Sequence, residues 1–519
     1  MRRSGGGDDA GGSREAGVVA VPRAARLIGL LRPASLVGLA ALALSPGLWL
    51  GPSLDAAVFV LAGVGIRQGD VPYRDLWDHK PPGSYLLNAA GQTALPWLDP
   101  WLVGWLLTFA FTGAAIVIFE RLLRSRLSPA AAFLWSVLGL LLMASFPIAL
   151  GGGLTESFAV LPLVAALVVL ARAASGVRAV ALIGCLLSVA CLLSLQALPA
   201  ALALFAAATL RRSGLLSLVG RAAAGVAGGV VLPLAVVAWL AVRGAIGDAL
   251  DQLVTYNAAY RSSADKADDM IPVTTLLLLC LTVPAAIEMA RMILKPRAFD
   301  RVGWACFAWA VGYLLYIGFQ GRIYLHYLIL LVPPAVWLAG AGTAWLAAQA
   351  KAPERRVRAT AVGLLVAAWL AIAISAFTVV GLHTALGRFS ADRAKQLDTA
   401  AWIDDNTPRS ATLFVWGHDA DLYLLANRHP YDSYVYDFPL LTAGYAPDER
   451  LANLVADWTA APPSVIVESL SEAPLLRAGE AGASTPDYPA LGALRDFVRS
   501  HYRLASSSER YDIYVPLGE

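Results

Sequence analysis

The feature that most constrains this sequence is a series of apolar windows, each about as long as a lipid bilayer is thick. A helix needs roughly 20 mostly apolar residues to cross a bilayer, and about eleven windows meet or approach that length. They lie near residues 34–52, 101–120, 130–149, 157–171, 178–194, 197–210, 218–242, 272–294, 302–319, 323–346 and 358–381. These windows predict an all-α polytopic membrane domain of about eleven transmembrane helices.

The composition agrees with a chain that lies mostly in lipid. Hydrophobic residues fill 58% of the 519 positions, charged residues fill only 15%, and the mean hydropathy is +0.62. A soluble domain of this length carries more charge. The net charge of +3 is small, and the basic residues are spread between the windows rather than gathered on one face with aromatic residues, which excludes nucleic acid as an expected partner.

The start of the chain has two interpretations. Three arginines precede an apolar segment, as they do in a cleavable signal peptide. The segment runs to Pro52, however, and is longer than the apolar core of a signal peptide, so an uncleaved first helix is favoured. Residues 1–26 are expected to be a disordered cytoplasmic N-terminus, followed by a transmembrane domain over residues 27–381.

Basic residues orient the predicted helices, because cytoplasmic loops of membrane proteins collect Lys and Arg. Alternate connections carry Arg121, Arg124 and Arg126; Arg172 and Arg178; Arg211, Arg212 and Arg221; Lys295, Arg297 and Arg301; and Lys351, Arg355, Arg356 and Arg358. These connections are predicted to be cytoplasmic. The intervening segments are predicted to face outward from the cell's inner or plasma membrane: 53–100, 150–156, 243–271, 320–322 and everything after residue 381.

After the last window the composition becomes that of a soluble protein. Residues 382–519 are expected to form a small extracytoplasmic α/β domain. A helix is predicted over residues 390–406, and strands are predicted at 412–416, 464–468 and 511–515.

Two groups of chemically active residues are better explained as structure. One run either binds a ligand or joins a strand end to a helix start, and the second interpretation is favoured; it contains Trp416, His418, Asp419 and Asp421. The four cysteines fall inside apolar windows without the spacing of metal ligands, so neither a disulfide framework nor a zinc site is expected; they are Cys185, Cys191, Cys280 and Cys306.

The strongest signal for function lies in the first outward segment. Asp55 follows the first window, and the run Gly69-Asp-Val-Pro-Tyr-Arg-Asp-Leu-Trp-Asp-His-Lys-Pro-Pro-Gly83 comes after it. Charged groups beside a bilayer are costly unless they are paired or functional. One interpretation is a reaction site. The other is a solvated cluster of salt bridges among Asp70, Arg74, Asp75 and Lys80.

These residues resemble the opening of a known superfamily, that of the protein mannosyltransferases and the lipid A aminoarabinose transferases. The resemblance rests on Leu-Asp-Ala at 54–56, Gly-Asp-Val-Pro-Tyr-Arg-Asp at 69–75 and Asp-His-Lys-Pro-Pro-Gly at 78–83, and again on Arg322-Ile-Tyr-Leu-His-Tyr-Leu-Ile-Leu-Leu-Val-Pro-Pro334. It is good over residues 30–160 and only architectural in the middle spans and the tail. It implies a C-type glycosyltransferase fold, a polyprenyl-phosphate sugar donor, and catalysis on the external face by an acidic residue of the first external loop, for which Asp55 is the matching position.

The chemistry of such a transfer supports the same residue. A lipid phosphate is a good leaving group, so the protein mainly needs a base for the acceptor hydroxyl and cations for the departing phosphate. Asp55 suits the role of base, in one displacement with inversion at the anomeric carbon. Lys80, with His79 beside it, suits the binding of the phosphate.

A second acidic residue stands at the mouth of the fourth window. Glu156 follows Gly151, Gly152 and Gly153, which permit either a close approach of the backbone to a ligand or a tight turn between helices. The resemblance places a catalytic acidic residue at about this point, where the family often has Asp rather than Glu.

Further candidates for binding the donor phosphate come from two later outward segments. Arg261 follows Tyr256 and Tyr260, which are more typical of the aromatic belt at a membrane surface. Arg322, Tyr324 and His326 open the tenth window, and an Arg and a His at headgroup depth are expected to meet phosphate or carboxylate. Lys80, Arg261 and Arg322 are expected to converge into one cationic pocket.

The sequence therefore favours a membrane glycosyltransferase that moves a sugar from a polyprenyl-phosphate donor to a glycan, lipid or protein acceptor. Asp55 has no adjacent acidic partner, so no metal site and no obligatory divalent cation or other cofactor is predicted. Two alternatives stay open. One is a transporter or flippase for lipid-linked sugars, which would show inverted repeats; the other is a non-catalytic membrane subunit that binds glycans.

The orientation is testable without any assumption about function. Single cysteines at Gly69 and Asp448 should react with an impermeant thiol reagent added outside intact cells, and one at Ser125 should react only after the membrane is opened. The reverse pattern would place the proposed site in the cytoplasm.

Overall fold

A computed structural model describes most of the chain. It describes residues 23–172, 176–210, 214–262, 271–320, 324–350, 390–470, 474–476 and 488–518, together with residues 357 and 387. The predicted window at 358–381 and the candidate Arg322 lie outside the described residues.

Helices occupy the first ten predicted windows. They are α1 (Arg23–Leu44), α2 (Pro46–Leu50), α5 (Pro100–Leu123), α6 (Pro129–Ala144), α7 (Phe146–Ala149), α8 (Thr155–Arg172), α9 (Val177–Leu193), α10 (Leu198–Thr209), α11 (Leu215–Val242), α14 (Ile271–Leu294), α15 (Arg301–Gln320) and α16 (Val332–Ala350), with short 3-10 turns before α10, α15 and α16. Six apolar segments of the described chain are long enough to cross a membrane: Leu31–Leu50, Pro100–Leu123, Thr155–Arg172, Leu215–Val242, Arg301–Gln320 and Leu325–Ala350. The chain is thus a multi-pass helical protein, and the count of about eleven spans stays a prediction.

The tenth window contains two helical segments of different type. It forms η4 (Leu325–Leu331), a 3-10 segment, and the α-helix α16 begins immediately after it. Pro333 and Pro334 lie in the first turn of α16, where the missing N–H of proline costs no hydrogen bond. The proline pair therefore starts a helix here instead of bending one.

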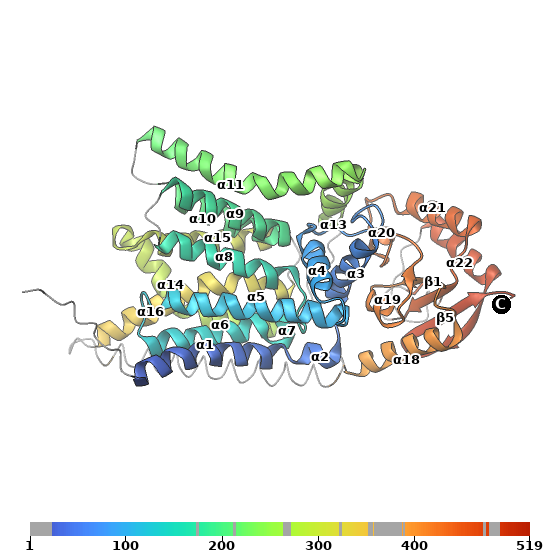
Figure 1. Cartoon of the computed structure of the whole chain (residues 1–519), viewed down its shortest axis with the longest axis horizontal. Helices are drawn as coiled ribbons and strands as arrows, with labels where there is room; N and C mark the ends of the chain where they lie inside the picture. The colour runs from blue at the N-terminus through green and yellow to red at the C-terminus, as the bar shows by residue number, and fades with distance from the viewer. Residues whose placement is uncertain are drawn as a thin grey trace, which may run out of the picture.

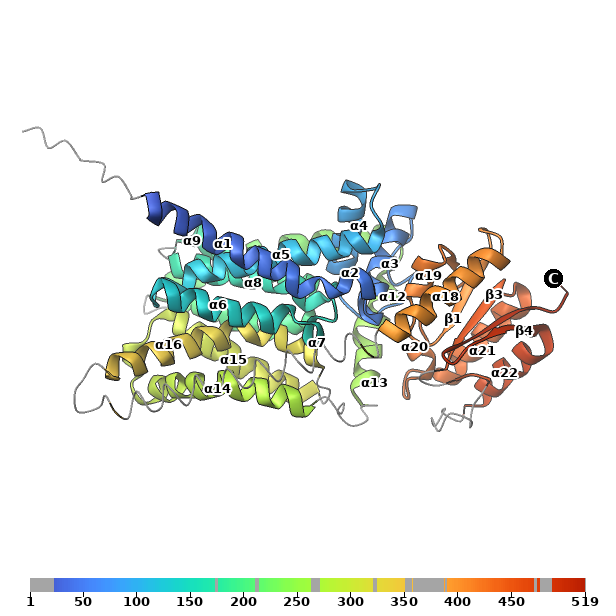
Figure 2. The same cartoon turned by 90° about the horizontal axis from the view of Figure 1, so that it is seen from below.

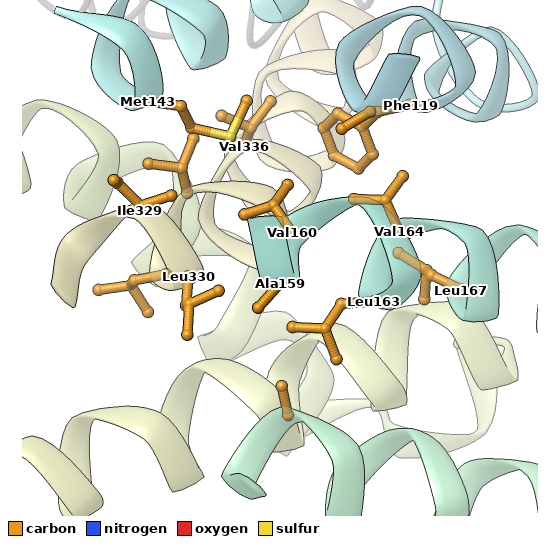
Figure 3. Packing of buried hydrophobic residues seen from close by; sticks show 14 of the residues in the cluster. Phe119, Met143, Ala159, Val160, Leu163, Val164, Leu167, Ile329, Leu330 and Val336 are labelled. Carbon is orange, nitrogen blue, oxygen red and sulfur yellow. The ribbon is translucent and has the colours of Figure 1, made fainter. Parts of the chain in front are cut away.

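The bundle packs around α8. In Figure 3 side chains of α8 interlock with those of η4, α5, α6 and α16; the labelled residues are Phe119, Met143, Ala159, Val160, Leu163, Val164, Leu167, Ile329, Leu330 and Val336. Because lipid is as apolar as these side chains, such contacts stabilise the bundle mainly through van der Waals packing. At the edge of the bundle, α11 leaves most of its apolar residues exposed, as expected of a helix that faces lipid (Figure 1).

Glycines let α9 and α11 approach each other closely. A Cβ added at Gly184 would lie 1.9 Å from the carbonyl oxygen of Gly225, and one added at Gly228 would lie 2.0 Å from that of Ala181. Small residues at such contacts are the usual means by which helices associate in a membrane.

Two shorter helices lie at one end of the bundle, where the sequence predicts an external loop. They are α3 (Leu54–Gln68) and α4 (Gly83–Ala94), which pack on each other and are joined by residues 69–82. Figures 1 and 2 show this helical hairpin between the bundle and the last part of the chain.

The described residues from Ser390 onward form what we call the C-terminal unit. Its helices are α18 (Ser390–Asn406), α19 (Asp421–Leu425), α20 (Phe438–Leu441), α21 (Pro447–Ala460) and α22 (Pro489–His501), and its strands are β1 (Thr412–Trp416), β2 (His429–Pro430), β3 (Val465–Ser469), β4 (Tyr502–Ser507) and β5 (Tyr511–Pro516). The sheet has the order β2-β1-β3-β5-β4, with β2, β1 and β3 parallel and the last two antiparallel. The predicted helix and the three predicted strands are confirmed to within about one residue.

Alternating side chains of β1 divide the C-terminal unit into two cores. Phe414 and Trp416 face a core made with α21 and α22. Leu413 and Val415 face the other core, which contains residues of α18 and α19 and continues into α3 and into Tyr85 of α4. One hydrophobic core therefore joins the C-terminal unit to the hairpin of α3 and α4.

The contact between α9 and α11 gives a stability test. Gly228→Ala should lower the midpoint of thermal unfolding in detergent, because its new methyl group meets backbone, and overpacking of this kind costs roughly 1–3 kcal/mol. Gly220→Ala on the same helix meets nothing within 4 Å and is the matched control. Equal midpoints for the two variants would contradict this helix packing.

Candidate active site

Asp55 lies in the first turn of α3, at the end of the bundle covered by the C-terminal unit. The Oγ of Ser53 caps the helix by accepting a hydrogen bond from the backbone N–H of Ala56 at 3.3 Å. A carboxylate in the first turn also complements the positive end of the helix dipole. The side chain of Asp55 keeps 34% of its surface exposed, so a substrate hydroxyl has access to it.

The glycine run before α8 lies directly beside this turn. Positive φ angles between 83° and 110° occur at all three glycines, Gly151, Gly152 and Gly153. A Cβ at Gly153 would lie 2.7 Å from the Cβ of Ala56, and the N–H of Gly153 donates to Thr108 Oγ1 at 2.8 Å. The glycines thus permit a close approach to α3 within the protein, and they support the turn that carries Asp55.

The segment between α3 and α4 is held in place by a buried carboxylate, that of Asp78. It accepts hydrogen bonds from the hydroxyl of Tyr85 at 2.5 Å and from that of Tyr436 at 2.8 Å. The backbone N–H of His79 donates to the same carboxylate at 2.8 Å. Burial raises the pKa of Asp78, and the hydrogen bond from Tyr85 opposes that rise.

Lys80 follows this anchor, and its backbone carbonyl accepts hydrogen bonds from the hydroxyls of Tyr73 and Tyr85 at 2.9 and 3.0 Å. Asp75, a possible partner, instead pairs with Arg74 at 2.7 Å. Within the described ranges, neither Asp75 nor Asp78 forms an ion pair with Lys80. The solvated salt-bridge cluster considered from the sequence therefore accounts for Arg74 and Asp75 and leaves Lys80 available.

Two buried polar residues complete the group from the membrane side. Glu156, at the start of α8, is 1% exposed and accepts a hydrogen bond from Ser194 Oγ at 3.2 Å. His326, in η4, is 7% exposed, stacks on Tyr324 and contacts the ring of Tyr327 edge to face. These positions place a second carboxylate and an imidazole within electrostatic range of Lys80.

The charges of the group act on one another. Burial by itself would raise the pKa of Asp55, but His418, Lys80, His326 and His79 together hold it below its usual value. Burial by itself would lower the pKa of Lys80, but Tyr327 and the carboxylates of Asp55, Glu156 and Asp78 raise it well above its usual value. Asp55 is therefore ionised and Lys80 is protonated at neutral pH.

The other predicted phosphate ligands are distributed more widely. His79 lies in an aromatic group between Tyr256 and Tyr260, with ring centroids at 5.1 and 5.5 Å. The hydroxyls of Tyr260 and Tyr324 lie 2.8 Å apart and join α13 (Asn257–Ser262) to the start of η4. These contacts bring the predicted outward segments 53–100 and 243–271 together with the start of the tenth window.

Arg261 has a different environment. Its guanidinium lies over the ring of Phe319, 4.0 Å from the centroid. Among the described residues, no ion pair or hydrogen bond joins Arg261 to Lys80 or Asp55. The convergence of Lys80, Arg261 and Arg322 into one pocket stays a prediction.

The C-terminal unit supplies residues that the sequence did not connect with Asp55. The run from Trp416 to Asp421 is, as favoured, a strand end followed by a helix start. In addition, His418 Nε2 lies 3.6 Å from Asp55 Oδ1, and Tyr436 binds Asp78. No local spacing could reveal these partners, because more than 350 positions separate Tyr436 from Asp78.

Metal ligands do not gather in the described ranges, where no three His, Cys, Asp or Glu side chains form a group suited to a metal ion. Independence from divalent cations stays a prediction.

The fold and this end-on site define a multi-pass membrane protein with the C-type glycosyltransferase fold, as the sequence resemblance implied. The chain superposes on ArnT from Cupriavidus metallidurans bound to undecaprenyl phosphate with a TM-score of 0.64 and 15% identity, over 95% of this chain and 99% of that one. The apo state of the same protein gives a TM-score of 0.62 and 14% identity, over 95% and 98%. Archaeal oligosaccharyltransferase AglB from Archaeoglobus fulgidus, in complex with an inhibitory peptide and a dolichol-phosphate, gives 0.50 and 12%, over 86% and 70%. No protein-family model matches the sequence. No curated protein matches it closely.

The anchor at Asp78 gives a testable expectation. Tyr436→Phe should lower the midpoint of thermal unfolding, because it removes a hydroxyl bond to a buried carboxylate, worth about 1.5–3 kcal/mol. Tyr431→Phe in the same unit is the control, since its hydroxyl binds exposed backbone. A Tyr436→Phe variant as stable as the Tyr431→Phe variant would mean that the hydroxyl does not hold this segment.

Proposed function

We propose that this protein is a glycosyltransferase that moves a sugar from a polyprenyl-phosphate donor to a glycan, lipid or protein acceptor at the outer face of the cell membrane. The observation that carries the proposal is the grouping of Asp55, Lys80, Glu156 and His326 at the end of the bundle beneath the C-terminal unit. The fold shared with ArnT, whose structure holds undecaprenyl phosphate, supports the same class of donor.

The proposed mechanism is one displacement with inversion. Asp55 removes the proton of the acceptor hydroxyl as its oxygen bonds to the anomeric carbon of the donor sugar. The bond from that carbon to the phosphate oxygen breaks, and polyprenyl phosphate leaves with the electron pair. Lys80 holds the phosphate by a charge-assisted hydrogen bond, with His79 and His326 as further candidate ligands. Tyr324, whose ring stacks on His326, is a further candidate ligand of the phosphate.

Glu156 has a supporting role in this scheme. It is buried and lies close enough to Lys80 to stabilise the ammonium group. A buried charge left without a counter-charge is costly, so Glu156 keeps Lys80 protonated before the donor arrives.

Reconstitution into liposomes with a panel of labelled undecaprenyl-phosphate sugars tests the class of function. Transfer of label to a water-soluble or lipid acceptor supports the proposal. Movement of intact donor between leaflets without cleavage would indicate a flippase, and saturable binding without either would indicate a glycan-binding subunit.

Asp55→Asn should abolish most transfer while the protein stays folded and still binds undecaprenyl phosphate. The change keeps the size of the side chain and removes its basicity, and a general base contributes about 10²–10⁴-fold to rate. Transfer within about tenfold of the unmodified protein would exclude Asp55 as the base.

Lys80→Ala should lower kcat/KM for the donor by about tenfold to a few hundredfold, since a charge-assisted hydrogen bond is worth roughly 1.5–3 kcal/mol. Donor saturation should weaken more than acceptor saturation, and Lys80→Arg should restore little because a planar guanidinium differs from a compact ammonium. Lys395→Ala, which removes an exposed ion pair with Glu509, is the matched control. Normal donor saturation with a lowered thermal midpoint in Lys80→Ala would make Lys80 structural.

A further inference from the structure

The C-terminal unit places an imidazole beside the carboxylate of Asp55. His418 Nε2 lies 3.6 Å from Asp55 Oδ1, and the side chain of His418 is only 11% exposed. His418 and Asp55 are far apart in the sequence and belong to different parts of the molecule. Their approach is therefore a product of the way the C-terminal unit sits on α3.

The backbone before His418 is shaped for this approach. Gly417 directly follows β1 and has a φ of 126°, a conformation that side-chain-bearing residues rarely adopt. A Cβ at this position would also lie 2.5 Å from the Cβ of Ser469 at the end of β3. The Gly417 carbonyl accepts the N–H of Asp437 at 3.2 Å. Only glycine lets the chain turn from the strand toward α3 here.

Asp419, the residue after His418, is held in place by hydrogen bonds. The Asp419 carboxylate accepts hydrogen bonds from Arg510 and from the Tyr511 hydroxyl, both at 2.8 Å. Burial by itself would raise the pKa of Asp419, but the charge of Arg510 and its hydrogen bond hold that pKa below its usual value. The Asp419 carboxylate therefore stays ionised at neutral pH. The turn that carries His418 is thus held from both sides.

The imidazole itself is clamped by aromatic rings. Its centroid lies 4.9 Å from that of Tyr436 and 4.7 Å from that of Phe438. Tyr436 also binds Asp78, which anchors the segment that carries Lys80. The same aromatic residue therefore sets the positions of His418 and of the segment holding the proposed phosphate ligand.

We propose that His418 is a positioning residue of the transfer reaction, which donates its Nε2 proton to one oxygen of Asp55 and aims the other oxygen at the acceptor hydroxyl. The proposal rests on the proposed function in its assignment of Asp55 as the base. Catalytic hydrogen bonds are often long in unliganded structures and shorten in the complex with substrate, so 3.6 Å suits a contact that closes on binding.

The other groups that face Asp55 serve the donor instead. Lys80 and His79 approach from the segment between α3 and α4, and His326 approaches from η4 on the membrane side. His418 is the member of this group that comes from the C-terminal unit.

The first experiment compares His418→Leu with His418→Gln in the transfer assay. Leu preserves the packing against Tyr436 and Phe438 and removes the N–H that donates the hydrogen bond to Asp55. Gln places an N–H near the position of Nε2. We expect His418→Leu to lower kcat by up to about a hundredfold with little change in donor KM, since misplacement of a catalytic group has effects of that size. His418→Gln should recover most of the loss. His501→Leu in α22, whose imidazole stacks on Phe497, is the control and should be unaffected.

A second readout needs no substrate. Loss of the His418 N–H should raise the pKa of Asp55, because that group is the largest of those lowering it. Infrared difference titration, with Asp55→Asn to assign the carboxyl band, measures this in the full-length protein. The acid limb of the pH profile of kcat/KM should move to higher pH in His418→Leu.

These outcomes separate the two proposals. Suppose that no donor supports transfer and that the pKa of Asp55 is higher in His418→Leu than in the unmodified protein. The proposed function would then be defeated, and the pairing of His418 with Asp55 would stand. An unchanged pKa of Asp55 in His418→Leu would overturn the pairing of His418 with Asp55, whatever the transfer kinetics. Equal kcat for His418→Leu and unmodified protein, or equal losses for His418→Leu and His418→Gln, would overturn the positioning role.

Discussion

The candidate site depends on the hydrophobic core that the C-terminal unit shares with the hairpin of α3 and α4. Residues of β1, α18 and α19 pack in one continuous core with Phe59 of α3 and Tyr85 of α4. Burial of apolar surface is the main favourable contribution to association of this kind. The core fixes the C-terminal unit over Asp55 and brings His418 and Tyr436 to the polar groups beneath it.

Within this enclosure a small number of buried hydrogen bonds determine where the charges lie. The Asp78 carboxylate is 3% exposed and takes hydroxyl donors from Tyr85 on one side and Tyr436 on the other. A buried carboxylate needs such partners because desolvation alone would cost several kcal/mol. These bonds anchor the segment before α4, and Lys80 follows Asp78 within electrostatic range of the carboxylates of Asp55 and Glu156.

The glycine run before α8 has a structural purpose that also serves the site. Its positive φ angles and its close approach to Ala56 exclude side chains at Gly153. Because Glu156 follows in the first turn of α8, the same turn supports Asp55 and positions Glu156. Two carboxylates from different helices thus depend on one segment of backbone.

The sequence by itself predicted the helical bundle and the strands of the C-terminal unit, and it singled out Asp55 and Lys80 as candidates for the site. It could do so because apolar length, strand alternation and isolated charges beside apolar windows are local signals. Only the tertiary structure decided that the first outward segment is a helical hairpin and that η4 precedes α16. It also decided that Asp78 is an anchor and that His418 and Tyr436 reach the site. The contacts of His418 with Asp55 and of Tyr436 with Asp78 join residues hundreds of positions apart, and no period or spacing in one segment contains that information.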